Sequence, residues 1–107
     1  MNDSKEEEKI EKLAAKRKSD AIIKIMQKPD ADVVVTALGA LATVGDEAAC
    51  NEITHYIDAE ERKVRIAACK AALTIKTEYM NTRVRHQIAE EKDPEVKAAI
   101  QAALNAK

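Results

Sequence analysis

Aromatic side chains are almost missing from this sequence, which contains no Phe, no Trp and two Tyr among 107 residues. A core must therefore be built from Ala, Ile, Val and Leu, since apolar residues still make up 46% of the chain. Small side chains of this kind suit helices that pack closely. The shortage also removes the stacking platform with which many proteins bind single-stranded nucleic acid.

Turn-forming residues are equally scarce, with two Gly and two Pro in the whole chain. A β-rich fold needs many tight turns, and such turns depend on these two residue types. Ala, Glu and Lys are common here and have a high helix propensity. The sequence therefore predicts an all-α fold, and its length allows one small domain.

Neither sign of charge dominates, because 18 Lys and Arg stand against 19 Asp and Glu and leave a net charge of −1. Nucleic-acid binding depends largely on neutralising phosphates, so we expect no nucleic-acid partner. No apolar run approaches the roughly 20 residues of a membrane span, and no apolar run follows the first basic residue, as a signal peptide requires. We therefore expect no membrane partner and a cytoplasmic location.

Sequence motifs of enzyme active sites are also missing. The chain has no Gly-rich phosphate loop, no nucleophile elbow and no HExxH, and Ser occurs only at positions 4 and 19. The two cysteines, Cys50 and Cys69, lack CxxC spacing and fall inside predicted helices, so we expect buried thiols rather than a disulfide or a redox pair. The sequence thus predicts no catalytic residue, no cofactor and no metal site.

Apolar residues from Ile10 onward recur every three to four positions, which is the spacing of amphipathic helices. We expect residues 1–4 to be flexible and residues 5–107 to form a single domain. For residues 5–28 we prefer one long or kinked helix, but Ser19 and Asp20 also suit the start of a second helix, so both arrangements stay open. The later predicted helices cover residues 31–44, 47–58, 61–75, 78–91 and 94–107.

A shift of 31 residues superposes the apolar positions of the chain on themselves. One extra residue ahead of the last predicted helix moves its copy of the pattern to Val96, Ile100 and Leu104. A period near 30 with two helices per unit is typical of an α-solenoid, in which stacking buries the apolar face of each unit. The aligned columns are Ile22, Ile53 and Val84; Met26, Ile57 and Ile88; Val33 and Val64; Ala37 and Ala68; and Val44 and Ile75.

The stretch VVVTALGALATVGDEAACNEITHYIDAEERKVRIAACKAAL resembles HEAT repeats of the short bacterial kind. The matching motifs are Val64-Arg65, Ala40-Leu41, the turn Val44-Gly45-Asp46 and the acidic loop 58–61, and the resemblance covers about residues 22–104. The family's Arg position holds Val34 in the first copy and Lys97 in the last, and the Gly-Asp turn becomes Lys76-Thr77 in the second copy.

This resemblance implies an α-α superhelix of about two and a half helical hairpins, with five to six helices. It also implies a right-handed superhelix, with the second helix of each pair on the concave side, and a role in binding other macromolecules. HEAT-like DNA glycosylases exist, but nothing in this chain matches their catalytic residues. The fold resemblance alone carries little information on function.

A mildly basic strip is the candidate binding site on the expected concave face. His55 and His86 lie 31 residues apart, with Lys24 one period earlier, and Arg83 and Arg85 flank them. The strip suits an acidic peptide or a phosphate-bearing partner, while the alternative is an ordinary solvated face balanced by nearby Glu. A metal pair is not favoured, because ligands are too few and the arginines oppose a cation. The candidate residues are Lys24, Glu52, His55, Arg83, Arg85 and His86.

The most specific function that these observations support is a non-catalytic scaffold or adaptor that binds another protein. One alternative is a self-associating structural unit that forms a homodimer by end stacking. Another is an accessory subunit of an enzyme, comparable to a bilin-lyase-like HEAT protein, although the chain is short and has few aromatic residues for handling a chromophore.

Overall fold

The computed structural model describes residues 2–27 and 30–106, and for residues 2–4 it describes the backbone alone. These residues contain seven helices and no strand, which confirms the all-α prediction. Within the same residues no helix is both long and apolar enough to cross a membrane. The helices are α1 (Asn2–Ala15), α2 (Ser19–Ile25), α3 (Ala31–Val44), α4 (Glu47–Tyr56), α5 (Arg62–Ile75), α6 (Glu78–Glu90) and α7 (Pro94–Asn105).

The preferred single helix over residues 5–28 is wrong, because the chain breaks into α1 and α2. The break lies at Arg17, whose φ of 57° is left-handed. Two hydrogen bonds join this break to the turn between α3 and α4. The Arg17 guanidinium donates to the Val44 carbonyl at 2.8 Å, and the Ser19 hydroxyl donates to the Asp46 carboxylate. The described residues therefore form seven helices rather than five to six, arranged as three hairpins followed by α7.

The start of α1 also differs from the expected boundary. The helix begins at Asn2, so the backbone of residues 2–4 belongs to it. Met1, the first residue of the segment expected to be flexible, lies outside the described residues.

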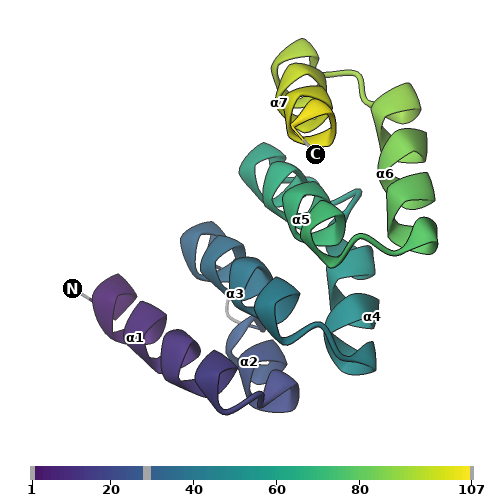
Figure 1. The fold of residues 1–107 in the computed structure, drawn as a ribbon. Coiled ribbons are helices and arrows are strands. Elements are labelled where there is room, and N and C mark those ends of the chain that lie inside the picture. Colours follow the sequence, from purple (N-terminus) through teal and green to yellow (C-terminus); the bar gives the residue numbers. More distant parts are fainter. Residues whose placement is uncertain (1, 28–29, 107) are drawn as a thin grey trace.

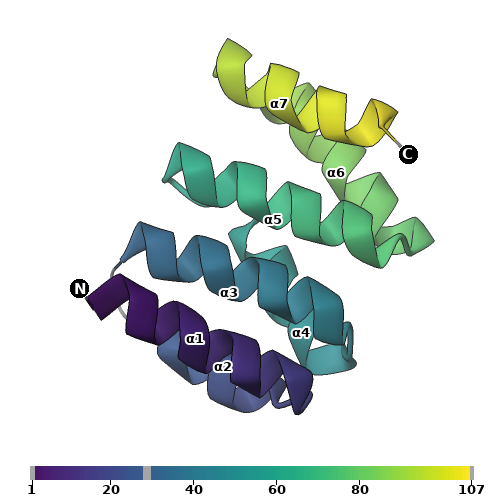
Figure 2. The ribbon, with the colours of Figure 1, turned by 60° about the vertical axis from the view of Figure 1, so that its left-hand side comes forward.

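The helices alternate between two layers that curve together (Figure 1). The first layer contains α1, α3, α5 and α7, and each of these helices packs against the next (Figure 2). The second layer contains α2, α4 and α6; α2 packs against α4, but α4 and α6 diverge. The closely packed first layer therefore lies on the inner side of the curve, and the second layer lies on the outer side.

This arrangement reverses the placement that the resemblance implied, since the second helix of each pair lies outside. The physical reason is side-chain size. Helix α3 consists mostly of Val, Ala, Leu and Gly, so its neighbours approach closely. Helix α6 instead carries Tyr79 and Arg83 at the positions where α4 has Ala48 and Glu52, one period earlier.

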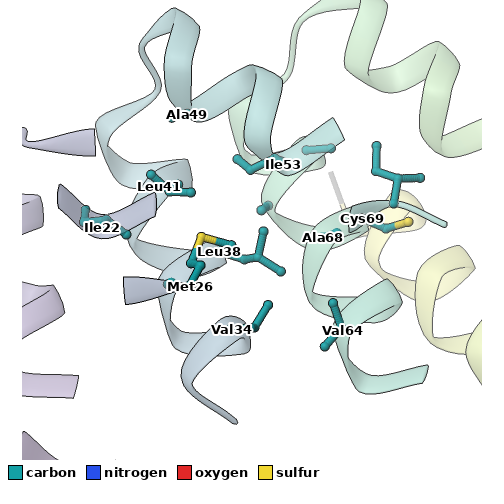
Figure 3. Packing of buried hydrophobic residues seen from close by; sticks show 14 of the residues in the cluster. Ile22, Met26, Val34, Leu38, Leu41, Ala49, Ile53, Val64, Ala68 and Cys69 are labelled. Atoms are coloured by element: carbon teal, nitrogen blue, oxygen red, sulfur yellow. The ribbon is translucent and has the colours of Figure 1, made fainter. Parts of the chain in front are cut away.

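The repeat columns form the core between the layers (Figure 3). Ile22, Ile53 and Val84 each have an exposed fraction of 0%. The outermost member of the next column, Ile88, is half-buried against the core. The 31-residue periodicity thus identifies the residues that hold the hairpins together.

Side chains cap the starts of α4 and α6. Asp46 accepts a hydrogen bond from the Ala49 amide at 2.9 Å, and Thr77 does the same for Met80 at 3.1 Å. Gly45 ends α3 with a φ of 65°, and Lys76 ends α5 with a φ of 66°. The turn that follows α5 therefore keeps its geometry without the glycine.

Candidate functional site

The six predicted site residues all lie on the outer layer. Lys24 belongs to α2, Glu52 and His55 belong to α4, and the other three belong to α6. Glu52 and Arg83 are half-buried, whereas the remaining four side chains are exposed. They do not line the inner face of the curve, and their role in binding stays a prediction.

A groove lies between α4 and α6, where the outer layer opens. Its volume is about 680 Å³. His55 and Arg83 are the predicted residues that line it, and Lys24, Glu52, Arg85 and His86 lie elsewhere. The full lining comprises Asn51, Thr54, His55 and Asp58 from α4 and the loop after it, and Tyr79 and Arg83 from α6.

Tyr79 is the groove residue that sequence reasoning missed. Its exposed fraction is 60%, and among the described residues it is the one large hydrophobic side chain that is exposed. A tyrosine combines a rigid apolar ring with a polar tip, which suits it to contact a partner. The sequence does contain a signal that could have identified Tyr79 as a site residue. It lies four residues before Arg83, which places both side chains on one face of a helix.

Arg83 lies in the same groove with its charge uncompensated. The structure shows no ion pair for this side chain within residues 5–27 and 30–106. Beneath the groove, the Thr54 hydroxyl donates to the Cys50 carbonyl at 2.9 Å and lies 3.8 Å from the Met80 sulfur. The hydrogen-bonding capacity of the Thr54 hydroxyl is thus used within α4. The guanidinium of Arg83 is available to an anionic group.

The surroundings of the two histidines do not form a metal-binding group among the described residues. Among the described residues, no group of three or more His, Cys, Asp or Glu side chains lies in a position to hold a metal ion. His55 and His86 are both exposed.

Both cysteines are free thiols; Cys69 is buried as expected, but Cys50 is only half-buried. Cys69 is fully buried, and burial raises the pKa of its thiol to about 12. Burial also raises the pKa of the half-buried Cys50 thiol, and the nearby Asp46 and Glu47 add to the effect. Because the thiolate is the reactive form, both side chains are poor nucleophiles at neutral pH.

Ion pairs tie neighbouring hairpins together along the edge where α3, α5 and α7 begin. Lys63 binds Asp32 at 2.8 Å, and Arg62 binds Asp93 at 2.7 Å; each pair joins residues one repeat apart. Arg65 donates to both oxygens of Glu91 and also to the carbonyls of Ala59 and Glu60. Sequence reasoning did not identify these pairs.

Comparison with known proteins agrees with this architecture. The chain matches the family model for HEAT repeats over residues 19–105, which is well over half of its length. No curated protein and no solved structure matches it. The paired helices, the 31-residue columns and the family match lead to one conclusion: the chain belongs to the HEAT-repeat family.

Proposed function

We propose that this chain is a non-catalytic protein-interaction module whose α4–α6 groove binds an acidic segment of a partner protein. HEAT repeats generally mediate protein binding, which supports the class of function. The observation that carries the proposal is the pairing of an exposed aromatic ring with an uncompensated guanidinium in one groove. Arg and Tyr, together with Trp, are enriched among the residues that dominate binding energy at protein interfaces.

The groove offers complementary contacts along its length. Arg83 pairs with a carboxylate or a phosphate of the partner, and the Tyr79 ring packs against a neighbouring apolar side chain. Asn51 and His55 on the opposite wall supply further hydrogen-bonding groups. Asp58 at the end of the groove disfavours acidic residues there, so the partner segment carries its negative charge beside α6.

The chemistry of the groove supports binding rather than catalysis. Of the two serines, Ser19 has a described side chain, and its hydroxyl is engaged with Asp46 away from the groove. Neither cysteine lines the groove, and burial keeps both thiols protonated. The groove therefore lacks an activated nucleophile of the serine or cysteine type.

Substitutions on α6 test the proposal. The wild-type chain, Arg83→Glu, Tyr79→Ala and Arg85→Glu are each immobilised and used to capture partners from a lysate of the source cells. Arg85→Glu is the matched control, because Arg85 is an exposed arginine on the same helix outside the groove. We expect Arg83→Glu and Tyr79→Ala to lose a partner that Arg85→Glu retains. Equal capture by all four proteins would show that the groove is not the binding site.

A further inference from the structure

A second concave site lies on the opposite side of α4, where α2, α3, α4 and α5 meet. It is a pocket of about 450 Å³ with an apolar floor and an acidic rim. The floor contains Met26, Val34 and Val64, and the rim contains Asp30, Glu60 and Glu61. Sequence reasoning did not identify this combination, because its residues come from three helices and two connecting segments.

The floor belongs to the hydrophobic core. Met26, Val34 and Val64 have exposed fractions of 2%, 7% and 4%. Figure 3 shows Val34 on α3 and Val64 on α5, on the facing sides of the two helices. The half-buried side chains of Tyr56 and Ala59 also line the pocket. The floor is therefore firmly held by packing, and its small outer surface is apolar.

The rim carries negative charge for which the described residues supply no ion-pair partner. Other carboxylates along this edge have cationic partners, as Asp32 has in Lys63 and Asp93 has in Arg62. Within the part of the chain that the structure describes, Asp30, Glu60 and Glu61 take part in no ion pair.

Two cations near the rim, Lys63 and Arg65, are already engaged. Lys63 holds Asp32, and its raised pKa reflects first the hydrogen bond with Asp32 and then the more distant charges of Glu61 and Asp30. The Arg65 guanidinium is held by Glu91 and donates to the backbone carbonyls of Ala59 and Glu60. Glu60 and Glu61 are exposed and form no ion pair with the described residues, whereas the half-buried Asp30 carboxylate accepts hydrogen bonds from the Asp32 and Val33 amides.

The shape of the site indicates which cation fits it. The described residues offer no group of three or more side chains placed to hold a metal ion, so the rim does not converge on one point. An apolar floor below spread carboxylates instead matches a side chain with an aliphatic stem and a charged end. Lys and Arg have this form, and they bury their stems along apolar surfaces while the charge stays at the rim.

We propose that this acid-rimmed pocket docks a Lys or Arg side chain from a basic segment of a partner protein. The aliphatic stem lies on Met26, Val34 and Val64, and the ammonium or guanidinium group lies among the carboxylates of Glu60, Glu61 and Asp30. The site is separate from the α4–α6 groove and has the opposite charge preference. One chain thus has separate docking places for an acidic and a basic segment, as an adaptor requires.

Peptide binding to the intact chain tests this proposal. The probe is a fluorescein-labelled peptide with two lysines flanked by leucines, and its partner peptide has glutamine in place of both lysines. Fluorescence anisotropy measures the affinity of each for the wild-type chain. We expect the lysine peptide to bind roughly tenfold more tightly than the glutamine peptide, as the loss of two partly exposed charge pairs predicts.

Variants of the protein locate the site. The double substitution Glu60→Gln with Glu61→Gln removes rim charge, and we expect it to weaken binding of the lysine peptide by roughly tenfold. The control is Glu47→Gln with Glu78→Gln, which makes the same change in net charge at the starts of α4 and α6. This control is expected to bind like the wild type. Ala59→Leu fills the pocket without changing charge and is expected to weaken binding as well.

Three results would overturn the proposal. Equal affinity for both peptides would mean that charge is not recognised, and equal weakening by both double variants would mean that only net charge matters. Absence of saturable binding to the wild-type chain up to about millimolar peptide would leave no site to assign. None of these results depends on Arg83 or Tyr79, so this test can fail while the proposed function of the α4–α6 groove stands.

Discussion

The same left-handed backbone conformation ends two helices, once at a glycine and once at a lysine. Gly45 and Lys76 occupy the same position in successive repeats, with φ of 65° and 66°. A Cβ atom in this region costs about 1–2 kcal/mol, whereas glycine avoids the clash. The first of these turns is therefore relaxed, and the second holds strain at Lys76.

Replacing Lys76 with glycine should stabilise the protein. Relief of the left-handed strain outweighs the greater freedom of the unfolded chain, so we expect the free energy of unfolding to rise by about 0.5–1 kcal/mol. Urea denaturation followed by circular dichroism measures it. Gly45→Ala is the opposite substitution at the equivalent position of the preceding repeat, and it should lower the free energy of unfolding by about 1 kcal/mol. Its Cβ would meet only the Ala42 carbonyl at 3.7 Å, so the backbone alone is strained. A loss of stability in Lys76→Gly would contradict this account.

Helix α4 shows how one element separates stability from binding. Ile53 and His55 are two residues apart, yet Ile53 is fully buried and His55 is exposed in the α4–α6 groove. The helical period of 3.6 residues turns neighbouring side chains toward different surroundings. One helix thus contributes both to the core and to the candidate site.

Substitutions on this helix should separate the two roles. Ile53→Ala leaves a cavity beneath α4 and should lower the free energy of unfolding by about 2–5 kcal/mol. His55→Ala should change it by less than about 0.5 kcal/mol, because the side chain is exposed. Thermal and urea unfolding of both variants provide the measurement. Similar losses in the two variants would mean that α4 is rotated relative to the described structure.

The burial of residues in the 31-residue columns could be predicted from the sequence. Features that occur in one repeat alone could not. Ile22, Ile53 and Val84 reveal their burial because the 31-residue period supplies three examples of one environment. The break at Arg17 depends on contacts with Val44 and its turn, 27 residues away, and no local pattern encodes them. The apolar stripe continued through the break in phase and therefore favoured one helix.

The candidate site was predictable only in part for a related reason. Periodicity placed Lys24, His55 and His86 in one column, but the spacing between neighbouring helices decides which side chains share a groove. Because α4 and α6 diverge while α2 and α4 do not, His55 and Arg83 share a groove that excludes Lys24. Helix divergence depends on packing across the whole molecule, and a single repeat does not reveal it.

In the whole molecule, ion pairs as well as apolar contacts hold the helices of the solenoid together. The Arg65–Glu91 pair is the most protected of the ion pairs described above, with side-chain exposed fractions of 17% and 3%. Burial opposes ionisation of Glu91, but hydrogen bonds from Arg65, Gln87 and the Asp93 amide leave its pKa below the usual value. The α5–α6 hairpin therefore depends on a charged carboxylate where α6 ends and the chain turns toward α7.

This dependence predicts a loss of stability in acid. A lowered folded-state pKa contributes stability that is present above the unfolded value of about 4.3 and is lost as pH falls through the folded value. Glu91→Gln should therefore cost about 1.5–3 kcal/mol at pH 7, and the difference from wild type should shrink below about pH 4. Urea denaturation across this pH range measures both proteins. A difference that does not vary with pH would show that ionisation of Glu91 is not involved.

The unequal spacing of the two layers gives the molecule a direction in which it bends easily. The inner helices touch continuously and resist stretching, so they act as the pivot of any bend. The outer layer offers little resistance between α4 and α6, and bending there moves α6 together with α7, which packs beside it. Such motion changes the width of the groove that contains Tyr79 and Arg83. The width of this groove is therefore coupled to the angle between the α3–α4 and α5–α6 hairpins.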